Sequence, residues 1–236
     1  MKRFILALAI LLTTMPGLMA QRRSGFGFDR DVDFSIGSGP ITFQSISYVG
    51  WGVHLPANVM AEEQRHALNS EFFLNIIELR ARIYEYGHIT LGVDWDRDCY
   101  RLDKEYYWQP GVNNQSVSIA RRGSERIRKT NLVVHTFSIP LGFEQRIGSC
   151  VLRLDGALDI NMAAKTRVKT EGPSGEKNLT VTKGIPTRTM TCHITAAVSF
   201  GGLGFYARYN PLPQFEAGVG PQYRPFTLGL VLGLGM

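Results

Sequence analysis

The chain has 236 residues, of which 44% are hydrophobic and 19% are charged, and 25 of them are glycine. Such a chain is too apolar to be disordered and too poor in charge for an ordinary helical domain. Its formal net charge of +6 comes from basic residues scattered along the sequence, which predicts no nucleic-acid partner. A β-rich chain of this length commonly forms one domain.

The N-terminus has the layout of a secretory signal peptide. Lys2 and Arg3 supply a basic start, residues 4–12 form a short apolar run, and Ala20 is a small residue suited to cleavage. The run is too short for a bilayer-spanning helix. We therefore expect residues 1–20 to be a signal peptide that is removed on export.

A leader and a first strand follow. Residues 21–40 are rich in glycine, serine and charge and keep no lasting period, so we expect a leader there. Residues 41–55 are apolar and aromatic with a blurred alternation. A strand is predicted for them, while its two faces stay open.

The clearest strand pair surrounds a turn near residues 85–87. On both sides of this turn, apolar residues alternate strictly with polar ones, which is the period of a β-strand. If Tyr84 lies opposite His88, apolar residues meet apolar residues across the hairpin, and Ile77 meets Trp95. One face of the hairpin is then apolar, and the other carries Glu, Arg and Asp.

The same period recurs along the rest of the chain. Further strands are predicted at residues 130–143, 150–166, 190–200, 203–209 and 226–236, which gives about eight in all. The connections alternate between short turns and long polar loops, and the long ones are predicted near residues 56–70, 97–129, 167–188 and 211–221. Outer-membrane barrels alternate short periplasmic turns with long outer loops in this way.

The last predicted strand indicates where the apolar face points. From Phe226 to Met236 every second residue is large and apolar, while Gly229 and Gly233 are among the residues between them. An apolar outer face and a bare inner face suit the wall of a narrow barrel in lipid. We therefore predict an all-β fold, an up-and-down antiparallel transmembrane β-barrel of about eight strands over residues 41–236. A soluble lipocalin-like exported carrier, with apolar residues inside, stays open as an alternative.

One stretch carries a resemblance to a known family. Residues 130–145, TNLVVHTFSIPLGFEQ, run toward an IPL-x-F corner, and residues 152–160 form a glycine-containing apolar run in the next strand. With the signal peptide, this pattern resembles the small outer-membrane β-barrel proteins of Bacteroidetes-type bacteria, the PorT-like group. The resemblance implies a barrel in the bacterial outer membrane, without implying one activity. The chain ends in Met236, where many bacterial barrels end in an aromatic residue.

The inward polar residues are predicted to fill the barrel. An eight-stranded interior is just wide enough for side chains, and buried charges need partners. A structural network is therefore expected in place of an ion pore. The predicted members are Glu78, Arg80, Arg82, Asp94, Asp96, Arg153, Asp155 and Asp159.

Residues 94–105, DWDRDCYRLDKE, place acidic residues at four positions of an EF-hand calcium loop. Cys99, however, stands where the sharp turn needs glycine, and Arg101 stands where an apolar residue is usual. We therefore favour a strand whose aspartates face inward and meet the arginines of the network.

A catalytic site is not predicted. Because residues alternate between the two faces of a strand, His135 is predicted to face lipid on the same side as Phe137 and Ile139. A histidine side chain is energetically costly there unless it lies near the membrane interface. A membrane-embedded lipid-modifying enzyme, the other alternative, needs a hydroxyl, a histidine and an acid at one rim, but Ser138 falls on the opposite face from His135. No catalytic residue, metal or cofactor is assigned.

The three cysteines, Cys99, Cys150 and Cys192, permit one disulfide at most, and their spacing does not say which two would pair. No two of them have metal-ligand spacing. Inert thiols are the favoured interpretation.

The first long loop is the predicted recognition surface. Aromatic residues and arginines together are enriched in protein interfaces. The candidate binding residues are Tyr106, Tyr107, Trp108, Arg121 and Arg122. We expect a structural or accessory outer-membrane barrel that acts through its outer loops, with outer-membrane lipids around it and envelope or secretion proteins as candidate partners.

Overall fold

The computed structural model describes residues 32–36, 39–55, 69–121, 123, 126–172 and 174–234. The described residues form strands, turns and one 3-10 turn at Val112–Asn114. The strands are β1 (Val32–Ile36), β2 (Gly39–Ser45), β3 (Val49–Leu55), β4 (Asn69–Tyr84), β5 (Gly87–Arg101), β6 (Tyr106–Pro110), β7 (Val117–Arg121), β8 (Arg126–Ile147), β9 (Cys150–Glu171), β10 (Lys177–Lys183), β11 (Met190–Phe200), β12 (Gly202–Tyr209) and β13 (Phe226–Leu234). No helix in the described residues is long and apolar enough to cross a membrane.

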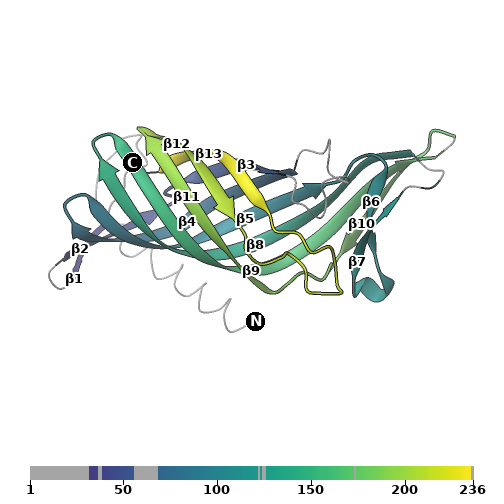
Figure 1. Cartoon of the computed structure of the whole chain (residues 1–236), viewed down its shortest axis with the longest axis horizontal. Coiled ribbons are helices and arrows are strands. Elements are labelled where there is room, and N and C mark those ends of the chain that lie inside the picture. The colour runs from purple at the N-terminus through teal and green to yellow at the C-terminus, as the bar shows by residue number, and fades with distance from the viewer. Residues whose placement is uncertain are drawn as a thin grey trace.

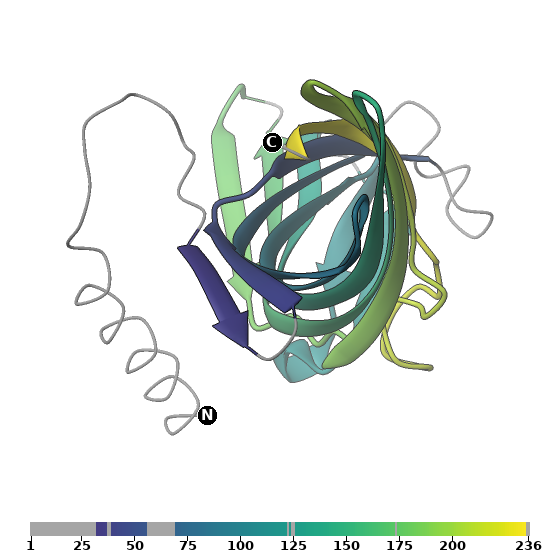
Figure 2. The same ribbon diagram turned by 90° about the vertical axis from the view of Figure 1, so that its left-hand side faces the viewer.

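Eight of the strands close into a barrel. The order of hydrogen-bonded neighbours is β3, β4, β5, β8, β9, β11, β12 and β13, and β13 pairs back onto β3. Every pair in this ring is antiparallel. Strongly tilted strands form the wall in Figure 1, and Figure 2 shows the ring from one end. The predicted eight-stranded, up-and-down antiparallel barrel is confirmed.

The first predicted strand is divided in two. β3 pairs with the first half of β4, whereas β2 pairs with its second half. The break lies at residues 46–48, where Ile46 has a left-handed φ of 54°. β1 pairs with β2 at the same end of the barrel and comes from the segment predicted as a leader (Figure 2). Residues 1–31, which contain the predicted signal peptide, lie outside the described residues, as does most of the loop predicted at 56–70.

The β4–β5 hairpin forms in a different register from the predicted one. Tyr84 pairs with Gly87, so the turn is two residues long, and Ile77 lies opposite Val93. Trp95, which was predicted opposite Ile77, lies opposite Leu74. In the second half of β4 the inward and outward residues are nevertheless the predicted ones, because a register shift of two residues leaves each side chain on the same face of the strand.

A β-bulge in β4 reverses the faces of its first half. The register shifts between Asn75 and Ile77, where an extra residue is inserted into the ladder. On the N-terminal side of this bulge, the odd-numbered residues Glu71, Phe73 and Asn75 are buried inside the barrel. The bulge therefore brings a carboxylate into the interior that strict alternation from Glu78 would have placed outside.

The outer face of the barrel is apolar on every strand, and we call this surface the apolar band. Its most exposed members are Trp51, Leu55, Leu79, Ile83, Ile89, Leu91, Ile139, Leu141, Phe143, Leu152, Leu154, Leu158, Ile194, Phe200, Leu203, Phe205, Leu228, Leu230 and Leu232. The residues between them point inward and are mostly polar. This polarity is the reverse of a lipocalin-like carrier, whose interior is apolar.

The last strand shows why its inner face is bare. A Cβ on Gly229 would lie 2.4 Å from the Tyr206 ring and 2.4 Å from the backbone oxygen of Trp51. The glycine therefore makes room for an inward tyrosine. Gly233 has a φ of 92°, and Leu234 after it is buried inside, so the prediction that Leu234 faces outward is wrong.

Two long connections predicted as loops contain strands. β6 and β7 form a hairpin inside residues 97–129, and β10 extends the sheet beside β9 inside residues 167–188. β8 and β9 continue well past the barrel toward the same end (Figure 1). We call β6, β7 and β10, together with residues 126–135 and 163–171, the outer extension. Lysine and arginine recur along these segments, which is why the sequence pattern resembled a loop.

Candidate functional site

Buried ion pairs fill the half of the barrel near the short turns, and we call them the turn-side network. Arg153 donates to Glu78 at 2.7 Å and to Asp155 at 2.8 Å. Arg80 donates to the other oxygen of Glu78 at 2.7 Å and lies 3.5 Å from Glu144. All five side chains are at least nine-tenths buried. Each arginine therefore neutralises carboxylates that could not stay charged alone in a dry interior.

A second set, the loop-side network, lies nearer the long connections. Arg208 contacts Glu71 at 2.7 Å and Asp96 at 2.8 Å, and it joins strands that are not neighbours in the sheet. His193 pairs with Asp159 at 2.8 Å. The network thus ties opposite walls of the barrel together through the interior.

Aromatic rings separate the two networks. Tyr48, Phe73 and Tyr206 pack with Val231 and Leu234 into an internal apolar cluster. The guanidinium of Arg153 lies 4.7 Å from the centre of the Tyr48 ring, and that of Arg208 lies 4.4 Å from the Phe73 ring. These contacts seat each arginine on a ring face as well as on its carboxylates.

The spaces left among these side chains are small. The space around the loop-side network has a volume of ≈ 10 Å³ open to the centre of a water molecule. The corresponding volume around the turn-side network is ≈ 20 Å³. Each of them has room for about one water molecule. The side chains of the two networks are accordingly packed closely enough to plug the interior around them.

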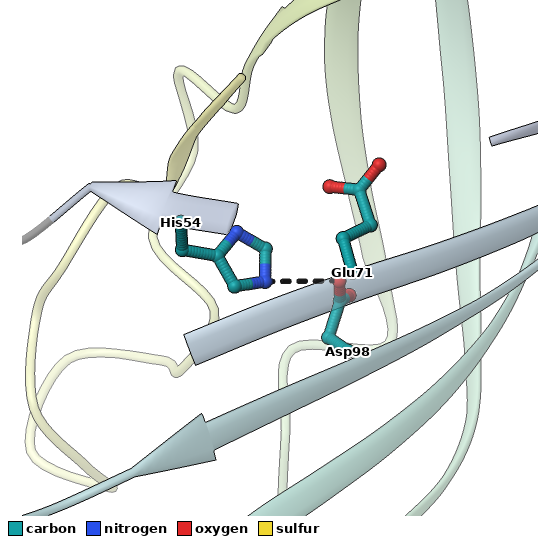
Figure 3. A group of neighbouring side chains, drawn as sticks. All are labelled: His54, Glu71 and Asp98. Atoms are coloured by element: carbon teal, nitrogen blue, oxygen red, sulfur yellow. Dashed lines mark ion pairs between the residues drawn. The ribbon is translucent and has the colours of Figure 1, made fainter. Parts of the chain in front are cut away.

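One trio of side chains in the loop-side space has a composition that suits a metal ion. One ligand atom from each of His54, Glu71 and Asp98 lies within 4.8 Å of the others. His54 comes from the end of β3, Glu71 from β4 and Asp98 from β5. Figure 3 shows the His54 ring pointing at the Asp98 carboxylate, with the Glu71 carboxylate to one side of this pair. His54 Nε2 lies 3.3 Å from Asp98 Oδ1, and the His54 ring stacks on Tyr100 at 4.9 Å.

An apolar core lies above the trio and closes the outer end of the interior. We call it the outer core, and its buried members are Tyr100, Leu102, Trp108, Val117, Leu132, Val134, Ala164, Ile185, Phe215 and Tyr223. The Trp108 indole donates to the backbone oxygen of Tyr100 at 3.1 Å. Residues from three connections and from β5, β8 and β9 thus build one lid over the barrel.

The structure places most of the predicted network inside, with two differences. Arg82 is exposed at the short-turn end of β4 and belongs to neither network. The aspartates were expected to meet the arginines of the network, but Arg80 reaches Glu78 and Glu144 and does not pair with Asp94. Asp94 accepts a hydrogen bond from Asn75 at 2.7 Å. The cause is the two-residue shift of the hairpin, which moves Arg80 opposite Thr90.

The candidate recognition residues do not form one exposed surface. Trp108 is fully buried in the outer core, so its predicted role as an exposed binding residue is wrong. Tyr106 and Tyr107 are half-buried, while Arg121 is exposed and pairs with Glu105 at 3.2 Å. Arg122 lies outside the described residues.

The remaining predictions concern the acidic stretch, His135 and the cysteines. Residues 94–101 form a strand, so no calcium loop is present there. His135 lies on the outer face, stacked on Trp95 at 5.7 Å, and Ser138 points inward, where its hydroxyl donates to Asp96. Ser138 and His135 therefore lie on opposite faces of β8, as the alternation of residues along the strand predicted. All three cysteines are free thiols.

His54 and Glu71 were missed by the sequence reading. His54 lies on the inner side of β3 together with Gly50 and Gly52. This alternation is hard to recognise in the sequence because the residues around it are apolar and aromatic. Glu71 faces inward only because of the bulge that follows it. No pattern within β4 announces that bulge.

Comparison with known proteins finds only distant structural similarity. No protein-family model matches the chain, and no curated protein matches its sequence. Among solved structures it is similar to Neisserial surface protein A (NspA), at 11% identity and a TM-score of 0.37 over 79% of this chain and 94% of that chain. It is also similar to Ail, the attachment invasion locus protein of Yersinia pestis, crystallised with the heparin analogue sucrose octasulfate, at 11% identity and a TM-score of 0.32 over 82% and 97%. Likeness at this level carries no argument about function, and the barrel itself rests on the strand pairings described above.

Proposed function

We propose that this protein is a non-catalytic β-barrel of the bacterial outer membrane that acts through its outer extension. The observation that carries the proposal is the apolar band. All eight barrel strands contribute to it, and between Trp95 and the short turns their outward positions carry no charged residue in the described part of the chain. Water would be a poor solvent for such a surface, whereas lipid chains match it.

The height of the band fits a membrane. On β9 it runs from Leu152 to Ile160, and nine residues extend about 30 Å along a strand at about 3.4 Å per residue. A strand tilt of about 40° reduces this to about 23 Å. Outer-membrane barrels carry an apolar band about 25 Å tall.

Aromatic residues border the band on both sides. At its outer edge the Trp95 ring packs edge-to-face on Phe72, with 6.1 Å between the ring centres, and stacks on His135. Arg97 is the next outward residue of β5. At the inner edge, Tyr84 and Tyr86 are exposed beside the first short turn. Aromatic girdles of this kind mark the two membrane interfaces of a barrel.

The outer extension is the part free to meet other molecules. Its surface is strongly basic, with exposed or half-exposed side chains of Arg121, Arg126, Arg128, Lys129, Lys165, Arg167, Lys169, Lys177 and Lys183. Because the interior is a plug, a channel function has no support. Charge complementarity favours an acidic partner at the outer rim.

Membrane location and orientation are tested together. In a background in which Cys99, Cys150 and Cys192 are replaced by alanine, a cysteine placed at Val112 should react with a membrane-impermeant maleimide in intact cells. A cysteine at Ile147, the last residue of β8 before the short turn to β9, should react only after the outer membrane is permeabilised. Recovery of the protein in the soluble periplasmic fraction, or the opposite labelling pattern, would contradict the proposal.

Recognition through the outer extension has its own test. If crosslinking in intact cells joins the protein to an acidic partner, Arg167→Glu should weaken that crosslink, because it reverses a charge on the basic surface. Arg82→Glu is the matched control, an exposed arginine at the opposite end of the barrel. Equal loss with both variants would argue against the outer extension as the binding surface.

A further inference from the structure

In the hydrogen bonds around the His54–Glu71–Asp98 trio, the donor of each bond can be assigned. The Thr227 hydroxyl donates its single proton to Glu71 Oε2 at 2.9 Å. The same hydroxyl oxygen lies 2.7 Å from His54 Nδ1. Because a hydroxyl has only one proton to give, His54 Nδ1 must be the donor in that second contact.

The other ring nitrogen of His54 is then left without a partner. In a neutral imidazole whose Nδ1 carries the proton, Nε2 presents a lone pair. Nε2 is buried and makes no hydrogen bond, although it points at Asp98 Oδ1 from 3.3 Å. A lone pair facing a carboxylate at this distance is repulsive, so a cation between the two atoms would satisfy both.

The separation of the two atoms suits a metal ion. Zinc binds histidine nitrogen and carboxylate oxygen at about 2.0–2.2 Å with tetrahedral angles, and this places two ligand atoms about 3.3 Å apart. Metal-bound histidines almost always donate their other ring N–H to an outer partner that fixes the ring. Thr227 occupies that position for His54, and it also orients Glu71. Stacking on Tyr100 fixes the plane of the His54 ring.

The charges around the trio favour a cation as well. Glu71, Asp96, Asp98 and Asp159 line the loop-side space, against the single guanidinium of Arg208. Glu71 already contacts Arg208, Tyr206 and Thr227, and because a carboxylate accepts about four hydrogen bonds, about one site is left for a further contact. Asp98 is the most exposed of the three ligands, at 15% of its side-chain surface, and lies toward the outer end.

We propose that His54, Glu71 and Asp98 bind one divalent transition-metal cation of the zinc class inside the outer end of the barrel. One imidazole nitrogen and two carboxylates are a ligand set that first-row divalent ions accept. The small space beside the trio leaves room for one water as a further ligand. The ion would join β3, β4 and β5 just below the outer core, and it is independent of the membrane proposal above.

The experiment uses the full mature chain refolded in detergent and freed of metal with a chelator. Zn²⁺ is titrated by calorimetry, and Co²⁺ is added separately as a spectroscopic stand-in whose visible absorption reports its ligands. We expect one equivalent of Zn²⁺ to bind with micromolar or tighter affinity. We expect His54→Gln and Asp98→Asn to weaken binding by at least about 100-fold, and Thr227→Val, which removes a positioning residue, to weaken it by about 10–100-fold.

His193→Gln is the matched control. His193 is the other buried histidine of the same space, it also contacts a carboxylate, and it is not part of the trio. This variant should keep the affinity and the Co²⁺ spectrum of the unaltered protein. Heat-modifiable mobility on a gel, checked for every variant, shows that the barrel has formed.

Three results would overturn the assignment. The unaltered protein could fail to bind Zn²⁺ stoichiometrically, His54→Gln could bind as tightly as the unaltered barrel, or His193→Gln could lose binding to the same extent as His54→Gln.

Discussion

Arg208 Nη1 lies 2.7 Å from Glu71 Oε1, in a contact that crosses the inside of the barrel from β12 to β4. The two strands are separated in the sheet by β13 and β3. Both side chains are almost completely buried. The ion pair therefore links two walls that share no backbone hydrogen bond.

Removal of Arg208 should destabilise the barrel strongly. Arg208→Met leaves the carboxylates of Glu71 and Asp96 buried without their cation, and breaking a buried pair in this way costs about 3–5 kcal/mol. The free energy of unfolding in lipid vesicles measures the loss. Arg121→Met, which breaks an exposed pair with Glu105, should leave that free energy unchanged. Equal effects would mean that the interior pair is not dry.

A charge on the apolar band should be costly in lipid. Leu230→Arg puts a guanidinium on the outer face of β13, where a midplane charge costs about 2–4 kcal/mol. Val112→Arg, at an 83% exposed position in the turn between β6 and β7, should have no effect. Unfolding titrations in vesicles compare the two variants, and a tolerated Leu230→Arg would contradict a lipid-facing band. Leu234 cannot serve in this test, because its side chain lies inside.

A methyl group on the inner face of β13 should disturb the packing. Gly229→Ala forces the Tyr206 ring and the neighbouring backbone to move, and overpacking of this kind costs about 1–3 kcal/mol. Gly156→Ala is the matched control, because a Cβ at this outward glycine of β9 meets nothing within 4 Å. If both variants unfold at the same denaturant concentration, the inward position of Gly229 is wrong.

The outer core should open without loss of the barrel. Trp108→Ala removes a fully buried indole, a change that typically costs about 3–5 kcal/mol. Limited proteolysis should then cleave the β6–β7 hairpin, while the heat-modifiable mobility of the barrel stays the same. Tyr107→Ala, at a half-buried neighbour, should leave the hairpin resistant. Loss of the barrel itself with Trp108→Ala would show that the outer core and the barrel fold as one unit.

Acid should weaken one contact of the outer extension. Arg128 donates two hydrogen bonds of 2.8 Å to Glu171, and they lower the pKa of that carboxyl below its ordinary value of 4.5. Because the pKa is lower in the folded state, this pair stabilises the β8–β9 ends above pH 4.5 and loses its effect as the pH falls through the native pKa. Arg128→Met should raise the pKa of Glu171 toward 4.5, which carbon NMR titration of its carboxyl measures. An unchanged pKa would mean that the two side chains do not meet in solution.

Local periodicity determined much of this fold. A period of two announces a strand and assigns each side chain to a face, so the barrel strands, the short turn after Tyr84 and the inward position of Asp94, Asp96 and Asp159 could be predicted from sequence neighbours alone. The bare inner face of β13 was likewise correctly predicted to be a response to crowding inside. Alternation survives a register shift of two residues, so the predicted faces of the β4–β5 hairpin were correct although Ile77 lies opposite Val93 and not opposite Trp95.

The contacts around His54 and the burial of Trp108 depend on the tertiary structure, above all on the closure of the barrel. His54 and Thr227 are 173 positions apart in the sequence, and they meet only because β13 returns to pair with β3. Glu71 joins them because one inserted residue reverses the faces of β4, and Trp108 is buried because separate connections fold over the same opening. Each of these arrangements depends on the energy of side chains brought together from distant strands, to which no local pattern of apolar and polar residues is sensitive.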